Sequence, residues 1–249
     1  MSRLCFVSDL HLFARRSGAA SHYGNLVDAA RRCDRIVLGG DIFDFRWSTL
    51  ANRQATADAA LDWLDRLLAD APETEVRYLL GNHDHVTPLV DALPKFCRLR
   101  PRMHWHMYYL RVGPAVFLHG DVADRPLHQS RLSREQFERR RGRSLHHGRR
   151  RRGRLSNAAY AALLQTRTQH VVPRVVYPTA ATAGRILSYL DQVGQRDGVQ
   201  EVFFGHTHRA VDGFERDGVR FHNAGAPIGR EPLIILQTEV PDDAAIAAA

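Results

Sequence analysis

Residue types that bind metal ions follow five short apolar segments of the chain. Together the groups contain carboxylates, imidazoles and one amide, but no thiolate. The five groups are Ser8-Asp9-Leu10-His11, Gly39-Gly40-Asp41, Gly81-Asn82-His83-Asp84, His119-Gly120-Asp121 and Gly205-His206-Thr207-His208. This donor set suits borderline to hard divalent ions such as manganese, iron, zinc or magnesium, and it disfavours copper(I) or an iron–sulfur cluster.

The segments before these groups must bring the side chains together. Mostly apolar runs that read as buried strands lie at 4–7, 35–38, 76–80, 115–118 and 201–204. In open α/β sheets, ligands gather outside the carboxyl ends of the strands, so five strand ends could deliver the groups to one place. Asp9 and His11 are two positions apart and would point to one side if the strand continued, as would His206 and His208. Each pair could hold one ion or two adjacent ions.

Further strands and helices complete an α/β architecture. Alternating patterns predict strands at 107–112, 219–222 and 233–238. Apolar residues at helical spacing predict helices at 61–69, 133–141, 157–169 and 181–193. Because strands and helices alternate along the chain, we expect an α/β fold.

The ordered motifs resemble the signature of the calcineurin-like metallophosphoesterases. They are Asp9-x-His11, Gly40-Asp41-x-x-Asp44, Gly81-Asn82-His83-Asp84, His119 and Gly205-His206-x-His208. The resemblance implies a four-layer α/β/β/α sandwich of mixed sheets flanked by helices, which holds two divalent metal ions. Manganese is the ion that we expect first, with iron, zinc or magnesium as alternatives.

The same resemblance implies a role for each candidate residue. Asp41 would bridge the two ions. Asp9, His11 and His208 would complete the first site, and Asn82, His119 and His206 the second. His83 would donate a proton to the departing oxygen, and we expect Asp84 to orient its imidazole. A phosphate ester or diphosphate would then be hydrolysed by a hydroxide that bridges the ions. Asp44 and Asp121 are expected behind the ligands rather than on the ions.

A basic insert separates two of the groups. Positions 122–174 carry 14 arginines against three acidic residues, a net charge of 14 − 3 = +11. We expect 122–199 to form an arginine-rich helical cap over a core of 1–121 and 200–240, with a disordered tail at 241–249. Guanidinium groups pair with phosphate in a bidentate way, and Arg131, Arg134 and Arg209 are the candidate substrate-binding residues. A solvated basic loop with no ligand is the alternative.

One branch of the family is similar in more than its ligands. The residues are Gly40-Asp41-Ile42-Phe43-Asp44-Phe45 with Trp47, His119-Gly120-Asp121, the long insert and Gly205-His206-Thr207-His208-Arg209. They resemble the UDP-2,3-diacylglucosamine hydrolases, which cleave a diphosphate in a lipid precursor at the inner membrane surface under a helical cap. This resemblance implies a nucleotide-linked or lipid-linked substrate and peripheral contact with an anionic membrane surface. The chain departs from the branch at His83, where those hydrolases usually have arginine, so a related phosphoesterase with another substrate fits as well.

Two other classes of function stay open. The basic insert would also suit a phosphodiesterase or nuclease that acts on nucleic acid, which we rank lower because no aromatic residues interleave the arginine run. A non-enzymatic metal-binding scaffold on the same fold is the other alternative. The complete ligand set favours an enzyme over that scaffold.

Composition agrees with a globular protein. Of the 249 residues, 44% are hydrophobic and 25% are charged, which is near the globular average. The longest stretch without Asp, Glu, Lys or Arg, 155–166, is too short to span a bilayer, and no secretory signal is visible. We therefore expect a cytoplasmic protein. Cys5, Cys33 and Cys97 are odd in number and scattered, which predicts reduced thiols.

Overall fold

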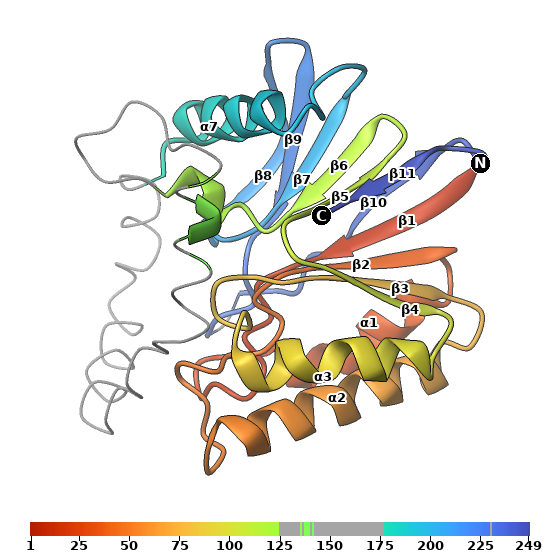
Figure 1. Cartoon of the computed structure of the whole chain (residues 1–249), viewed down its shortest axis with the longest axis vertical. Coiled ribbons are helices and arrows are strands. Elements are labelled where there is room, and N and C mark those ends of the chain that lie inside the picture. The colour runs from red at the N-terminus through yellow and green to blue at the C-terminus, as the bar shows by residue number, and fades with distance from the viewer. Residues whose placement is uncertain (125–134, 136, 140, 142–176, 230) are drawn as a thin grey trace.

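Two β-sheets packed face to face form the centre of the protein, as a computed structural model shows (Figure 1). The structure describes residues 1–124, 135, 137–139, 141, 177–229 and 231–249. The first sheet has the strand order β10-β1-β2-β3-β4 and the second has the order β11-β5-β6-β7-β9-β8. Both are mixed sheets, because each contains parallel and antiparallel pairs; in the first sheet only the edge strand β10 is antiparallel. The family resemblance predicted this arrangement.

The first sheet is built largely from the N-terminal part of the chain. Its strands are β1 (Ser2–Val7), β2 (Arg35–Gly39), β3 (Glu75–Leu79), β4 (Met103–His106) and β10 (Leu236–Val240). Three helices cover its outer face: α1 (Tyr23–Ala30), α2 (Arg53–Asp70) and α3 (Thr87–Arg98). The Asn52 side chain accepts a hydrogen bond from the backbone N–H of Ala55 at 2.9 Å and thereby caps α2.

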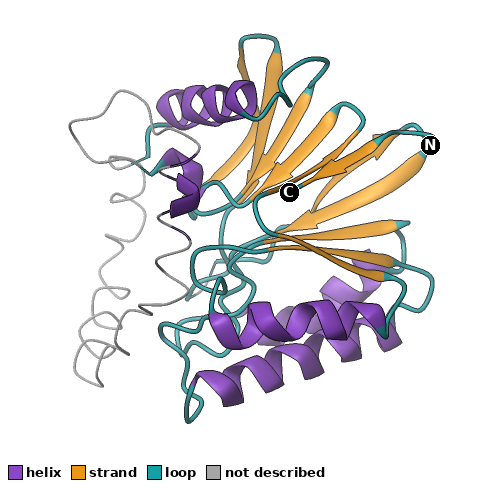
Figure 2. Cartoon of the chain, in the orientation of Figure 1, coloured by secondary structure: helices purple, strands orange, loops and turns teal. Residues whose placement is uncertain are grey.

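The second sheet contains β5 (Tyr109–Val112), β6 (Ala115–Leu118), β7 (Glu201–Phe204), β8 (Ala210–Arg216), β9 (Val219–Ala224) and β11 (Ile246–Ala248). A short turn, Asp121–Ala123, follows β6. Helix α7 (Thr179–Gln192) lies on the outer face of this sheet, so the layers run helix, sheet, sheet, helix (Figure 2). Between the sheets, apolar side chains such as Phe6, Phe117 and Phe203 pack together.

Helix α7 falls inside the segment predicted to be a cap, 122–199, but it belongs to the core. Ala183, Ile186 and Leu190 are fully buried and pack in one cluster with Val116 and Val202 of the sheet. The predicted boundary at 199 lies just before the strand predicted at 201–204 and is too late, because α7 already packs on the sheet after the basic segment ends at 174. The helix predicted at 157–169, and most of the one predicted at 133–141, lie outside the described residues.

Two expectations about the ends of elements are wrong. The tail 241–249 was expected to be disordered, but Ile246–Ala248 pairs with β5 as strand β11, because the unpaired edge of β5 offers it backbone partners. The strand predicted at 107–112 is present as β5 but begins only at Tyr109, because residues 107–108 connect it to β4, which ends at His106 in the first sheet. Within the described residues, no helix is both long enough and apolar enough to cross a membrane.

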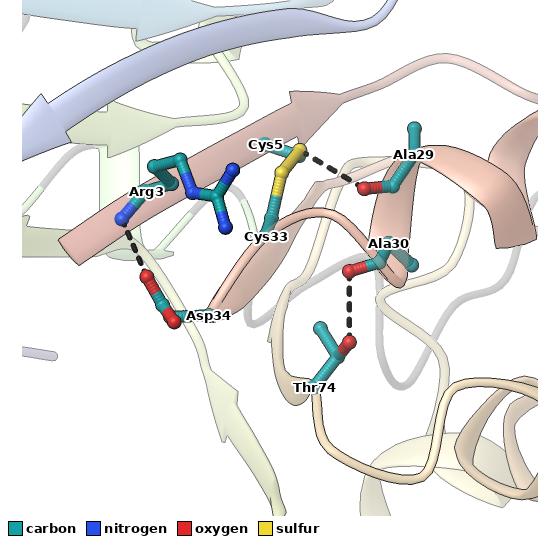
Figure 3. The surroundings of a disulfide bond; sticks show 7 residues. All are labelled: Arg3, Cys5, Ala29, Ala30, Cys33, Asp34 and Thr74. Carbon is teal, nitrogen blue, oxygen red and sulfur yellow. Dashed lines mark hydrogen bonds between the residues drawn. A yellow bond between two sulfur atoms is a disulfide. The ribbon is translucent and has the colours of Figure 1, made fainter.

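A disulfide joins Cys5 to Cys33, which corrects the prediction of reduced thiols (Figure 3). Cys5 lies on β1 and Cys33 lies in the turn before β2, and their Cα atoms are 6.1 Å apart because these strands are parallel neighbours. Sequence spacing could not reveal this pair, because the two residues are 28 positions apart. Cys97 remains a free thiol.

Candidate metal centre

All seven predicted metal ligands lie just after the carboxyl ends of strands. Asp9 and His11 follow β1, Asp41 follows β2, Asn82 follows β3, His119 follows β6, and His206 and His208 follow β7. Both sheets therefore contribute, and the site lies where the carboxyl ends of their parallel strands meet. The prediction from strand ends is confirmed in this respect.

The backbone of these loops is unusual. Among the residues that the structure describes, seven non-glycine residues have a positive φ, and five of them are predicted ligands: Asp9 (54°), His11 (47°), Asp41 (52°), His206 (68°) and His208 (54°). Left-handed backbone is uncommon for residues with a side chain and costs free energy, so it persists where the surroundings demand it, often at functional sites. Strand geometry therefore does not continue past β1 and β7. Such a continuation, considered from the sequence, would have pointed Asp9 and His11 to one side, and His206 and His208 likewise. Tight left-handed turns aim the side chains instead.

The first group of donors consists of Asp9, His11 and His208. One ligand atom from each lies within 4.8 Å of the others. His208 Nε2 is 3.0 Å from His11 Nε2 and 3.4 Å from Asp9 Oδ1. Asp9 and His11 are fully buried, whereas His208 is half-buried. Burial and the nearby Arg16 guanidinium lower the pKa of His11 to about 4, so its imidazole is neutral and able to bind a cation.

The second group consists of Asp41, His119 and His206, again with ligand atoms within 4.8 Å of one another. His119 Nε2 is 3.4 Å from Asp41 Oδ2 and 3.1 Å from Asn82 Oδ1, so the amide oxygen belongs to the same cluster. His206 and His208 thus point to different groups, although only Thr207 separates them. Burial opposes a charge on His119, but the Asp41 carboxylate outweighs it and raises the pKa of His119 to about 10.

Asp41 lies between the two groups. Its carboxylate belongs to a third cluster, with His11 and His83, as well as to the cluster with His119 and His206. It is buried, and despite that burial the surrounding imidazoles, above all His119, hold its pKa well below the ordinary value. A carboxylate with donors on both sides is the geometry that a bridging ligand requires.

His83 is positioned by Asp44 and not by Asp84. His83 Nδ1 is 3.0 Å from Asp44 Oδ1, and its backbone N–H donates to Asp41 Oδ1 at 2.7 Å. The Asp84 carboxylate instead accepts hydrogen bonds from Gly81 N at 2.5 Å, Ile42 N at 3.0 Å and the Tyr78 hydroxyl at 2.8 Å. The prediction that Asp84 orients the imidazole is therefore wrong, because neighbouring backbone donors engage both of its oxygens. Asp84 ties the loop after β3 to the loop after β2.

Asp44 also contacts the first group. Its Oδ2 atom is 3.3 Å from His11 Nδ1 and accepts a hydrogen bond from Arg16 Nη2 at 3.0 Å. Asp44 is fully buried, and although burial opposes its charge, His11 and His83 hold its pKa well below the ordinary value. It therefore lies behind two functional imidazoles, as expected for a carboxylate that supports the ligands without being one.

Two glycines of the motifs are required by close packing. A Cβ atom at Gly81 would collide with the Asp41 carboxylate, and one at Gly205 would collide with the Asp9 carboxylate and Ser8. Any side chain at either position would displace a candidate ligand. These glycines are therefore part of the site, and not merely turn residues.

Asp121 forms a buried ion pair with Arg141 of the insert. Arg141 donates to both Asp121 oxygens at 2.6 and 2.9 Å, and to the carbonyls of Leu80 and Met107, each at 2.8 Å. Both partners are buried, with side-chain exposures of 3% and 2%. Despite burial, Arg141 holds the pKa of Asp121 below its ordinary value. The pair fixes the turn that follows His119.

The structure does not test the prediction that Arg131, Arg134 and Arg209 bind substrate. Arg131 and Arg134 lie outside the described residues. Arg209 directly follows His208 and is half-buried. Sequence reasoning missed Arg16, Asp124 and Tyr177, which contact site residues. No motif contains them, so only their place in the fold reveals them.

The residues present fit a pair of divalent cations. The donors are carboxylate, imidazole and amide groups, which suit manganese, iron, zinc or magnesium. Imidazole nitrogens and carboxylates that approach one another while buried leave lone pairs and negative charge that a cation would compensate. The ligand sets and the shared carboxylate thus agree with a dinuclear centre.

Comparisons with known proteins agree with this site. The family model for calcineurin-like phosphoesterases matches residues 2–210. A solved structure of a dimetal phosphatase from Danio rerio is similar in fold, with a TM-score of 0.51, 14% sequence identity and coverage of 99% of this chain and 95% of that one. No curated protein matches the sequence significantly. The chain belongs to the calcineurin-like phosphoesterase family of metal-dependent phosphoesterases.

Proposed function

We propose that this protein hydrolyses a phosphate ester or diphosphate with two divalent ions, which Asp41 bridges. Asp9, His11 and His208 would hold the first ion, and Asn82, His119 and His206 would hold the second. The observation that carries the proposal is the position of Asp41, whose carboxylate shares one cluster with His11 and another with His119 and His206. When bound, the ions supply an activated water as nucleophile and neutralise the phosphate oxygens.

His83 supplies the proton for the leaving oxygen in this proposal. Burial opposes its charge, but the carboxylates of Asp41 and Asp44 outweigh that effect and raise the pKa of His83 above the ordinary value. This shift favours the protonated imidazolium, which is the form that can donate a proton. Because Nδ1 faces Asp44, the Nε2–H is the proton that remains available for donation.

We further propose a nucleotide-linked diphosphate that carries a lipid as the substrate class. The proposal rests on the resemblance of the segments around Asp41 and His206 to the UDP-2,3-diacylglucosamine hydrolases, and on the net charge of +11 over 122–174. Arginines in such number favour a polyanionic substrate and contact with an anionic membrane surface. His83 in place of arginine favours a substrate different from that of the named hydrolases.

The proposal is tested by hydrolysis and metal content together. The purified chain is loaded with Mn²⁺, Zn²⁺, Fe²⁺ or Mg²⁺ and assayed on p-nitrophenyl phosphate, bis-p-nitrophenyl phosphate, a nucleotide diphosphate and a nucleotide-diphosphate lipid in vesicles. We expect two ions per chain and turnover that Asp41→Ala abolishes. Asp212→Asn, which alters a solvent-exposed carboxylate outside the site, is the matched control.

Three results would contradict the proposal. Full turnover in Asp41→Ala would exclude this site as the catalytic one. Tight binding of two ions without turnover on any phosphate of the panel would favour the scaffold. Hydrolysis of DNA or RNA alone, with binding that weakens steeply between about 50 and 200 mM salt, would favour the nuclease.

A further inference from the structure

The candidate ligand His206 has two polar neighbours outside the predicted ligand set. Asp124 Oδ1 is 2.8 Å from His206 Nε2, and the Tyr177 hydroxyl oxygen is 3.3 Å from the same nitrogen. The Tyr177 hydroxyl also donates a hydrogen bond to Asp124 Oδ1 at 2.6 Å. The tyrosine ring meets the imidazole edge-on, with centroids 5.5 Å apart. Two residues therefore constrain one face and one nitrogen of this imidazole.

We propose that Asp124 and Tyr177 are positioning residues that fix His206 with Nε2–H toward Asp124 and Nδ1 toward the second ion; this inference rests on the proposed function. A carboxylate can only accept, so the neutral imidazole must place its proton on Nε2 to satisfy the 2.8 Å contact. The lone pair of Nδ1 is then free to bind a cation. Histidine ligands in metal sites are commonly held by a carboxylate in this way.

Asp124 acts through His206 and not on the ion itself. The groups of three donors found among the described residues include His206 with Asp41 and His119, but none includes Asp124. The Asp124 side chain is 29% exposed, whereas that of His206 is 10% exposed. Asp124 is thus the more solvent-accessible partner of the pair.

The pair comes from the two sides of the basic insert. Asp124 ends the described chain before 125–134, and Tyr177 begins it after 142–176. The guanidinium of Arg185 on α7 donates to the Ala123 carbonyl at 2.6 Å, which holds the two sides together beside the pair. The base of the insert is therefore connected to His206, the proposed ligand of the second ion.

The test measures the affinity of each ion in the full-length chain. Mn²⁺ titration calorimetry and the absorption spectrum of the Co²⁺-loaded protein are recorded for wild type, Asp124→Asn and Tyr177→Phe. We expect Asp124→Asn to weaken one of two ions about 10- to 100-fold and to alter its Co²⁺ bands, while the other ion binds as before. Tyr177→Phe should weaken the same ion less, about 2- to 10-fold. In the double variant the effects should not add, because the two residues act as a unit.

Matched controls come from similar pairs elsewhere. Tyr23→Phe removes a tyrosine–aspartate hydrogen bond to Asp70, and Asp212→Asn alters a carboxylate beside His222; both should leave the two affinities unchanged. Unchanged affinities and spectra in Asp124→Asn and Tyr177→Phe would overturn this inference alone. Equal weakening of both ions would overturn it as well. A wild-type chain that binds fewer than two ions would overturn the proposed function and this inference together.

Discussion

The two candidate ion sites differ in the origin of the residues that support them. In the first site, His11 is backed by Asp44 and Arg16, which lie in the loops after β2 and β1 and are largely buried. In the second, His206 is backed by Asp124 and Tyr177, which flank the insert, and His119 precedes a turn that Arg141 of the insert holds. Two neighbouring sites with similar donors are therefore built from different parts of the chain.

This difference teaches that the first site belongs to the core, whereas the second depends also on residues at the insert. A change in the insert can reach the second ion through Asp124 or Asp121, but it has no comparable described route to His11. The supporting residues, and not the ligands, distinguish the two halves of the centre. Variants of the supporting residues can therefore separate the contributions of the two sites.

Loss of one ion should have the largest effect. Asp9→Ala removes a carboxylate of the first site, and we expect kcat to fall at least about a thousandfold, because a bound ion contributes several kcal/mol to the transition state. Metal analysis by mass spectrometry should show one ion retained, held by the second site. Retention of both ions, or of neither, would break the assignment of Asp9 to a separate first site.

Substitution of His83 should separate chemistry from metal binding. In His83→Asn we expect kcat to fall about 10²- to 10⁴-fold with two ions still bound, since His83 donates a proton but holds no ion in our proposal. In wild type, turnover should decline as the pH rises through the raised pKa of His83, and this decline should be absent in the variant. A loss of metal in His83→Asn would instead make it a ligand, as its cluster with His11 and Asp41 allows.

The buried pair beneath the second site should matter for folding. Asp121→Ala leaves the Arg141 guanidinium buried without its carboxylate, and we expect the free energy of unfolding to fall by about 3–5 kcal/mol in urea titrations. Asp65→Asn is the control, because the pair Asp65–Arg100 is largely exposed and should contribute no more than about 1 kcal/mol. Equal losses in the two variants would show that burial does not distinguish these pairs.

Asp44→Asn should affect the first site more than the second. The substitution removes the carboxylate that contacts His11 Nδ1. We therefore expect the first ion to bind about 10- to 100-fold more weakly, while the affinity of the second ion is unchanged. Because Asp44 also holds His83, turnover should fall even when excess Mn²⁺ restores both ions. Calorimetric titration with Mn²⁺ and kcat at saturating metal measure these effects. Selective weakening of the second ion would reverse the comparison between the two sites.

The pair Asp121–Arg141 also predicts a pH dependence of stability. Arg141 outweighs burial and lowers the folded-state pKa of Asp121 below 3.8, so the unfolded chain binds its proton first as the pH falls. The pair therefore contributes fully to the free energy of unfolding above the pKa that Asp121 has in the unfolded chain. This contribution decreases as the pH falls from that pKa toward the lower pKa of Asp121 in the folded protein. Urea titrations at about pH 7, 5 and 3 should show the difference between wild type and Asp121→Asn shrinking only at the lowest pH. A difference that grows toward acid would contradict the sign of this shift.

Much of the site could be predicted from sequence because each ligand follows a buried strand. Apolar runs mark strand ends, and a ligand type after each end is visible in the printed order of residues. The left-handed turns at Asp9, His11, His206 and His208 could not be predicted in this way. Their backbone angles are imposed by packing against other loops, so residue spacing suggested strand alternation instead.

The errors have a common physical origin. Asp84 stands next to His83 in sequence, yet its carboxylate bonds the loop of Ile42, while Asp44 from that other loop reaches the imidazole. Cys5 and Cys33 meet only because β1 and β2 are parallel neighbours. In each case the deciding contact joins segments that are remote along the chain.

The sequence by itself determined the donor types, their order and the strands that carry them, because these depend on local chemistry and on the periodicity of apolar residues. Only the tertiary structure decided which donors lie within reach of one another, which carboxylate supports which imidazole and which cysteines pair. Those relations depend on distances across the two sheets. Such distances arise from the packing of the whole chain and have no local signal.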